Sequence, residues 1–352
     1  MFSRPRTQSL TLLKFGVALA LLYAFRDVLW PLAVALVLAI LINAAARRVA
    51  MIFPKAGRWT VFGLTAFIVG GLILASMYVV ASGVSRMIAQ TPHLIGKLNV
   101  FLAAAPTYAP IPRSLSELGR GVDIGGFAGQ VASALQDALS GLGLTVLYLV
   151  FLLATRRAIE KRMAKIVKQH ASSAAVDVIQ RSMVGVGSYM YIQTVTGLMI
   201  AAGAAIVMLA AGLDNWAFWA LAMFLLSFLP VIGVLLGALG PTAFAIVQFP
   251  SVWPAILIFV GMQIVAFIVG NLVLPKMQAD SQNIDPTASL VAIGFWTILW
   301  GAPGAFLAIP LTLAVMYALA HYPHLEWIAI LISNDGDPTP VALAETASEP
   351  VA

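Results

Sequence analysis

The C-terminal half of this chain carries almost no charge. Between Ser182 and Ile332, a stretch of 151 residues contains only five charged side chains. These are Asp214, Lys276, Asp280, Asp285 and Glu326. A soluble domain covers its surface with charged and polar side chains, and it cannot hide this much apolar surface in its own core. This half of the chain is therefore predicted to lie in a lipid bilayer.

The composition of the whole chain narrows the possible functions. The chain is 61% hydrophobic and 10% charged, with a mean hydropathy of +0.97, which is far from the proportions of soluble proteins. It has no Cys, which excludes a disulfide framework, a thiolate metal site and a cysteine nucleophile. Of its 20 Lys and Arg residues, 19 lie at or before Arg181, mostly in loops between apolar runs. That pattern is typical of membrane topology determinants and not of a nucleic-acid-binding surface.

Sequence motifs of common enzymes are missing. The chain has no G-x-S-x-G, no G-x-x-x-x-G-K-[ST] and no H-E-x-x-H, so it does not hydrolyse ATP by itself. We therefore expect no enzyme activity, no cofactor and no metal site. The expected partners are the lipid bilayer and a small-molecule or ion substrate, with no nucleic acid.

The apolar runs predict an all-α polytopic membrane protein of about 7–8 transmembrane helices. Residues 1–81 contain three runs, Phe15–Phe25, Val28–Ala46 and Trp59–Ala81. The second and third have 19 and 23 uncharged residues, enough for one crossing each. The first follows three basic residues and could also be a signal peptide. We favour an uncleaved span, because this run leads directly into the next one.

The middle of the chain sets the predicted orientation. Residues 82–138 are mixed in polarity and interrupted by prolines, which predicts an extramembrane connector of short helices, either a lid or a packed connector. Residues 139–181 are predicted to form a fourth span and then a basic amphipathic helix, Arg156–Lys168, at an anionic cytoplasmic surface. Placing this helix and the basic loop Arg47–Arg58 inside puts the N-terminus in the cytoplasm.

Residues 182–332 are predicted to form the transport core, and residues 333–352 a disordered tail. Two apolar segments of the core, Trp216–Leu229 and Thr287–Trp300, have 14 residues each. As helices they would be about 21 Å long, shorter than the hydrocarbon layer of about 30 Å. They predict either two broken or re-entrant helices, or ordinary kinked spans. The predicted hinge residues are Pro230, Gly233, Pro241, Pro275, Gly301, Gly304 and Pro310.

A short polar segment interrupts the apolar core between these two helices. We call residues 271–285 the polar island. It is either a water-exposed loop or a site that dips into the membrane, where a carboxylate could take a proton or cation and Lys276 could pair with it. Trp296 and Trp300, four residues apart, either line a pathway or pack. The candidate pathway residues are Asn271, Lys276, Gln278, Asp280, Asp285, Trp296 and Trp300.

Three motifs resemble one family of bacterial permeases. Phe228–Gly233, followed by Gly240 and Pro241, resembles the P-x-x-G element of the autoinducer-2 exporter family. Gly270–Lys276 matches its N-x-x-x-P-K element, and Phe295–Pro310 resembles its G-x-x-G-x-x-x-A-x-P ending. The chain departs from the family's pattern after the fourth span, where it has Ala154–Arg157, and at Ala279, where the family often has Gly. Both departures weaken the assignment of the family's substrate to this chain.

The resemblance implies a secondary transporter of the bacterial inner (plasma) membrane that exports small molecules, with sodium/proton exchange in some family members. It also implies a homo-oligomer, with a pentamer as the expected form. The alternatives are a cation/proton antiporter, favoured if Asp280 or Asp285 lies buried in the membrane, and a membrane scaffold without transport.

Overall fold

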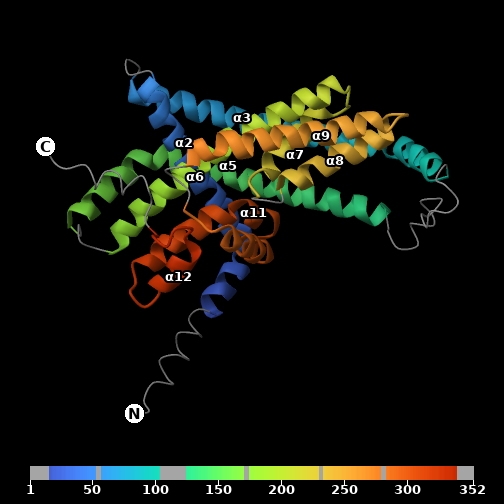
Figure 1. Cartoon of the computed structure of the whole chain (residues 1–352). Helices are drawn as coiled ribbons and strands as arrows, with labels where there is room; N and C mark the ends of the chain where they lie inside the picture. The colour runs from blue at the N-terminus through green and yellow to red at the C-terminus, as the bar shows by residue number, and fades with distance from the viewer. Residues whose placement is uncertain are drawn as a thin grey trace, which may run out of the picture. The chain divides into compact units, whose positions relative to one another are not determined.

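The structure is a computed structural model, and it describes residues 16–52, 57–103, 124–169, 174–229, 233–278 and 283–338. These residues form helices joined by turns, with no β-strand among them. In chain order the elements are α2 (Arg26–Ile52), α3 (Arg58–Ala103), α5 (Ile124–Gln169), α6 (Ala174–Ala210), α7 (Trp216–Leu226), α8 (Gly233–Gln248), α9 (Trp253–Ile268), the π-helical turn η1 (Val269–Val273), α10 (Leu274–Gln278), α11 (Pro286–Ala320) and α12 (Glu326–Ile332). Figure 1 labels most of them.

The predicted all-α polytopic fold is confirmed. Within the described ranges, six helices are long and apolar enough to cross a membrane: Arg26–Ala46, Thr60–Met87, Ser140–Ile166, Val178–Ala210, Trp253–Met277 and Pro286–Ala320. Two shorter apolar helices, α7 and α8, accompany them. The expected first span, Phe15–Phe25, starts outside the described residues; residues 16–24 are helical and end in a turn at Phe25 before α2 begins.

The connector differs from the expected short helices. Residues 82–103 continue α3, and residues 124–140 begin α5, so both are extensions of transmembrane helices. Each of these helices has 46 residues and is about 69 Å long, more than twice the hydrocarbon thickness. The basic segment Arg156–Lys168 likewise continues α5 without a break. The remaining connector residues, 104–123, lie outside the described residues.

The chain divides into two compact units. Unit 1 consists of Met1–Ala44, Gly141–Met190 and Asp280–Ala352, and unit 2 of Ala45–Ser140 and Tyr191–Ala279. The boundaries fall inside α2, α5 and α6, so each of these helices contributes residues to both units.

Unit 2 is built around the short helices α7 and α8. Figure 1 shows these helices beside α9, and α8 contacts both α7 and α9. The buried core is contributed by α6 to α9 and includes Met208, Met223, Phe244, Ile258 and Met262. Glycines let α6 and α9 approach closely, since a Cβ on Gly261 would lie 2.7 Å from Val207 of α6.

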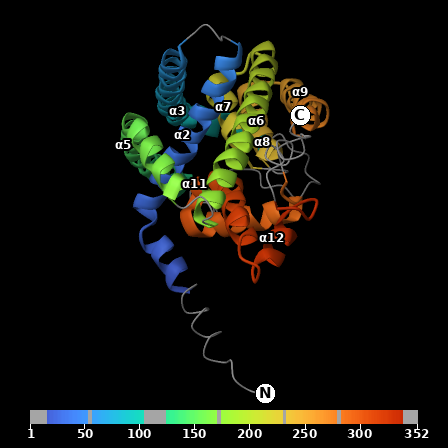
Figure 2. The same cartoon turned by 90° about the vertical axis from the view of Figure 1, so that its left-hand side faces the viewer.

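Unit 1 contains α11 and α12, which pack against each other and are drawn in orange and red in Figure 2. Within this unit the N-terminal part of α6 packs closely on both α2 and α11. A Cβ on Gly187 would lie 3.2 Å from Ile40 of α2, and a Cβ on Gly185 would lie 2.6 Å from the ring of Tyr317 in α11. Close helix packing through small residues is typical of proteins in a bilayer.

Candidate functional site

The helix α11 is broken near its middle. Its backbone leaves the helical conformation at Gly301, where φ is 67° and ψ is −145°, a region almost restricted to glycine. Trp296 donates from its indole Nε1 to Thr312 Oγ1, 16 residues later, at 3.1 Å. In a straight helix these residues would lie about 24 Å apart along the axis. The two halves of α11, residues 286–300 and 302–320, are therefore folded against each other as a hairpin.

Gly304 closes this hairpin. A Cβ at this position would lie 2.6 Å from the carbonyl carbon of Trp296 and 3.1 Å from the Cβ of Trp300, and it would overlap the Trp296 carbonyl oxygen. Backbone atoms cannot move away from such a contact as a flexible side chain can. The turn after Gly301 thus needs a residue without a side chain at position 304.

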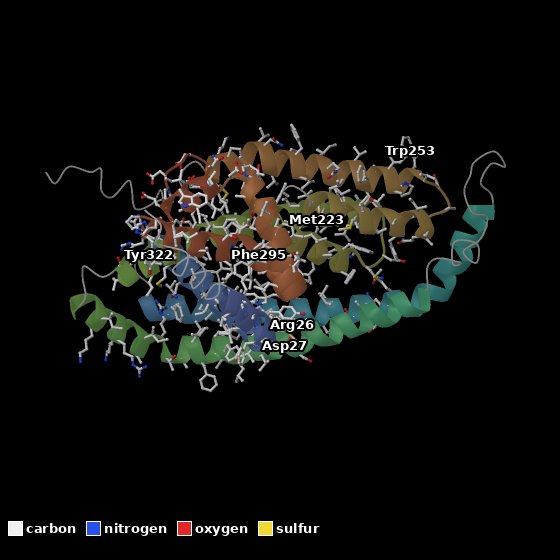
Figure 3. The ribbon with its side chains drawn as sticks, turned by 90° about the horizontal axis from the view of Figure 1, so that it is seen from below. Arg26, Asp27, Met223, Trp253, Phe295 and Tyr322 are labelled. Atoms are coloured by element: carbon white, nitrogen blue, oxygen red, sulfur yellow. The ribbon has the colours of Figure 1, made fainter. Side chains whose placement is uncertain are left out.

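The two predicted pathway tryptophans lie on the first half of the α11 hairpin. Both are buried, with ring centroids 5.3 Å apart. Figure 3 labels their neighbour Phe295, whose ring contacts that of Trp296 edge to face. Trp300 donates to the carbonyl oxygen of Leu22 at 3.1 Å. Because both indole N–H groups are already hydrogen-bonded within unit 1, a solute at this place would meet the ring faces.

Unit 2 contains a second hairpin of the same kind. Helix α7 ends at Leu226, α8 begins at Gly233, and Pro230 between them lies outside the described residues. A Cβ on Gly233 would lie 2.8 Å from the carbonyl carbon of Leu226 and 3.0 Å from the Cβ of Leu229. This repeats the arrangement around Gly304. In both hairpins a glycine lies against a backbone carbonyl of the preceding short helix.

A glutamine of α6 donates a hydrogen bond to the C-terminal end of α7. Gln193 donates from Nε2 to the carbonyl oxygen of Ser227 at 2.5 Å, and the Ser227 hydroxyl donates to Phe224 O at 2.6 Å. The last carbonyls of a helix have no partner within the helix, so these bonds stabilise the α7 end. Sequence analysis did not single out Gln193. Its position as a polar residue inside the uncharged stretch Ser182–Leu213 was the available signal.

Two predicted hinge prolines do not interrupt their helices. Pro241 is buried inside α8, which continues from Gly233 to Gln248, and Pro310 is buried inside the second half of α11. The only non-helical backbone within α11 is at Gly301. Within α11 the break therefore lies at Gly301, whose positive φ is readily adopted only by glycine, and not at Pro310.

Pro275 accompanies a local change of helix type. The backbone N–H of Leu274 bonds to Val269 O, five residues back, which makes η1 one π-helical turn between α9 and α10. A proline ring in an α-helix collides with the carbonyl four residues earlier, here that of Asn271, and the wider π turn relieves this contact. Asn271 lies in this turn, exposed, with its amide bonded to Phe267 O at 3.0 Å.

Two other residues of the polar island, Lys276 and Gln278, lie in the short helix α10. Lys276 has an exposed side chain in its last turn, where a cation is favoured by the helix dipole. Gln278 is the last residue of α10, and Asp280 lies outside the described residues.

Asp285 caps the first half of α11. Its Oδ1 accepts from the backbone N–H of Thr287 at 2.7 Å and from that of Ala288 at 3.0 Å. The hydrogen bond from Ala288, helped by that from Thr287, lowers the pKa of this half-buried carboxyl below its ordinary value. Asp285 thus stays ionised at neutral pH, in the role that aspartate commonly takes at helix N-termini.

The start of the predicted disordered tail is instead folded against the polar island. The buried Asn283 accepts at Oδ1 from the backbone N–H of Asn334 at 2.9 Å and of Asp335 at 3.2 Å. Its Nδ2 donates to Asp335 Oδ1 at 2.6 Å and to the carbonyl oxygen of Asp337. One amide side chain thus holds three backbone groups of residues 334–337. Residues 339–352 lie outside the described residues.

The arrangement of the described residues offers apolar hairpins and hydrogen-bonding groups. No cluster of His, Cys, Asp or Glu suited to a metal ion occurs among them. What the chain provides is two pairs of short helices whose ends meet at tight turns. Ends of broken helices expose backbone N–H and C=O groups, which bind polar solutes or ions in many transporters.

Comparison with known proteins identifies the family. The family described as AI-2E family transporter matches residues 12–324, nearly the whole chain. The chain belongs to this family. Its apolar helices make it a multi-pass membrane protein.

Several individual relatives of this AI-2E family transporter carry the names of transport proteins. The AI-2 transport protein TqsA of Escherichia coli is 29% identical over 205 residues, which cover 57% of each chain. A Haemophilus influenzae protein is 25% identical over 213 residues, 60% of this chain and 61% of its own. YhhT of E. coli is 24% identical over 315 residues, 86% of this chain and 87% of its own. The chain thus matches less than two thirds of the length of the first two relatives.

Proposed function

We propose that this protein is a secondary transporter, a permease that exports small solutes across the bacterial inner membrane. Membership of the AI-2E transporter family supports transport as the function. The structural observation that carries the proposal is the broken helix α11, which turns at Gly301 within a 35-residue apolar segment. Breaking a helix in hydrocarbon leaves backbone groups without partners, so such turns occur where they are buried in protein or line a water-filled path. Gly301 and Ala302 at this turn are exposed, which favours a path.

The solute is proposed from the relatives. TqsA is named as an AI-2 transport protein, and AI-2 is the first solute to test on this chain. Purified protein should be reconstituted into liposomes loaded with AI-2, and release should be followed with and without ion gradients. We expect faster release than from protein-free liposomes of the same lipid. Equal rates under every gradient would reject AI-2 transport.

The polar-island and tryptophan candidates remain part of this proposal. In unit 1, Trp296 and Trp300 would line a path with their ring faces, and Asp280 and Asp285 would flank it. In unit 2, Asn271, Lys276 and Gln278 are separate candidates for contact with a solute. The capping role of Asp285 and its lowered pKa favour a structural charge over a proton carrier. A cation/proton antiporter would then depend on Asp280. Asp280→Asn should be tested in liposomes that contain a pH indicator and are given a sodium gradient, since an antiporter that depends on Asp280 would lose its sodium-driven pH change.

The orientation and assembly are also proposed. The basic end of α5 favours the cytoplasmic side, which would place the N-terminus inside. Because the chain has no Cys, single substitutions Lys161→Cys and Gly96→Cys can be labelled in intact cells with an impermeant thiol reagent. We expect labelling at position 96 and not at 161; the reverse pattern would refute the orientation. A homo-oligomer, with a pentamer as the first expectation, can be checked by native mass spectrometry.

A further inference from the structure

One turn of α6 in unit 1 carries a buried hydroxyl without a partner. Tyr189 is 2% exposed, and its Oη forms no hydrogen bond with any described residue. The residue lies within the candidate span Val178–Ala210, where bulk water is not available to satisfy it. A buried polar group without a partner is costly and rare, so this hydroxyl requires an explanation.

The hydroxyl belongs to the side of α6 that packs on α11. Gly185, four residues before Tyr189, is covered by the ring of Tyr317, since a Cβ at Gly185 would lie 2.6 Å from that ring. Residues four apart share one side of a helix. Tyr189 therefore lies one turn further along the same α6–α11 contact, and Tyr317 does not accept or donate a bond to it.

We infer that the Tyr189 hydroxyl is a contact point for the transported solute, in a hydrated passage between α6 and α11 in unit 1. This inference rests on the proposed transport function. A phenol hydroxyl can donate and accept a hydrogen bond. The matching ligand class is an uncharged polar group, such as a hydroxyl or an amide.

The first experiment asks whether the position is hydrated, and it does not depend on transport. In the Cys-free chain, Tyr189→Cys is compared with Met190→Cys, its equally buried neighbour. The probe is methyl methanethiosulfonate, which reacts with thiolates, and thiolates form only where water or polar groups reach the sulfur. We expect labelling at 189 at least tenfold faster than at 190. Equal slow rates would overturn the inference, whether or not the protein transports AI-2.

The second experiment asks whether the hydroxyl contacts solute. Tyr189→Phe removes only the hydroxyl and leaves the packing intact, so an unfolded variant is not expected. We expect the KM for AI-2 in proteoliposomes to rise about tenfold, equivalent to about 1.4 kcal/mol, with the unfolding temperature unchanged or higher. Tyr78→Phe, at an exposed tyrosine of α3, is the control.

An unchanged KM in Tyr189→Phe would overturn the solute contact while leaving the transport function in place. Absence of AI-2 flux in the wild-type protein would instead reject the proposed AI-2 substrate. In that case the labelling rates at positions 189 and 190 still decide whether the passage exists.

Discussion

The hairpin in α11 predicts opposite effects of the same substitution at two glycines. Gly304→Ala would place a Cβ 2.6 Å from the Trp296 carbonyl carbon, against backbone that cannot rotate away. Overpacking of this kind typically costs about 1–3 kcal/mol. Gly294 lies in the first half of the same helix with nothing within 4 Å of its Cβ position. There, alanine should stabilise the helix by about 1 kcal/mol relative to glycine. The two variants should therefore differ by about 2–4 kcal/mol.

The free energy of unfolding can be measured in mixed micelles by titration with a denaturing detergent. Tryptophan fluorescence suits this assay, because Trp296 and Trp300 lie beside the turn. We expect Gly294→Ala to be at least as stable as the wild-type protein and Gly304→Ala to be clearly less stable. Equal stabilities of the two variants would refute the close contact between position 304 and the Trp296 carbonyl.

Further predictions concern hydrogen bonds around this hairpin. Asp285→Ala should destabilise the start of α11 at neutral pH. Because the pKa of Asp285 is lowered in the folded protein, the difference from the wild type should begin to shrink as the pH falls below about 4 and vanish only below the lowered pKa, as thermal unfolding across pH would show. Trp296→Phe and Thr312→Val should each lower the free energy of unfolding by about 1 kcal/mol, and the double variant should lose less than the sum of the two. A double-mutant cycle without coupling would exclude the hydrogen bond between these side chains. Asn283→Ala should release residues 334–337 and speed protease cleavage there, whereas unchanged cleavage would show that the tail is held by other contacts.

The membrane fold was predictable from the sequence because hydropathy determines it directly. Long uncharged runs must be helical in lipid, where every backbone group needs a partner within its own segment. The two broken segments were also visible as runs too short to cross. The choice between a kinked span and a hairpin was not visible, because it depends on Gly301 adopting a positive φ and on contact between residues 16 apart, such as Trp296 and Thr312.

The polar residues were harder to assign from sequence. Asp285 stood out by its charge, yet its carboxylate caps a helix. Asn283 was noticed only as part of the island, although its amide holds the segment that was predicted to be disordered. Tyr189 and Gln193 were not selected, because an uncharged polar side chain within an apolar run gives little signal. The surroundings of these two side chains depend on which helices pack together. That packing involves contacts between glycines and residues far from them in the sequence.

The central claim is that solute passes the turn of α11, and a single cysteine at this turn tests it most directly. Ala302 follows the break at Gly301 and has an exposed side chain. Ile298, 83% exposed on the first half of the same hairpin, is the matched control. Ala302→Cys and Ile298→Cys proteins should be reconstituted, treated with a water-soluble thiol reagent and assayed for AI-2 release. We predict that modification at 302 blocks release and that treatment of the 298 variant does not. Complete modification at 302 with undiminished release would contradict a path along this turn.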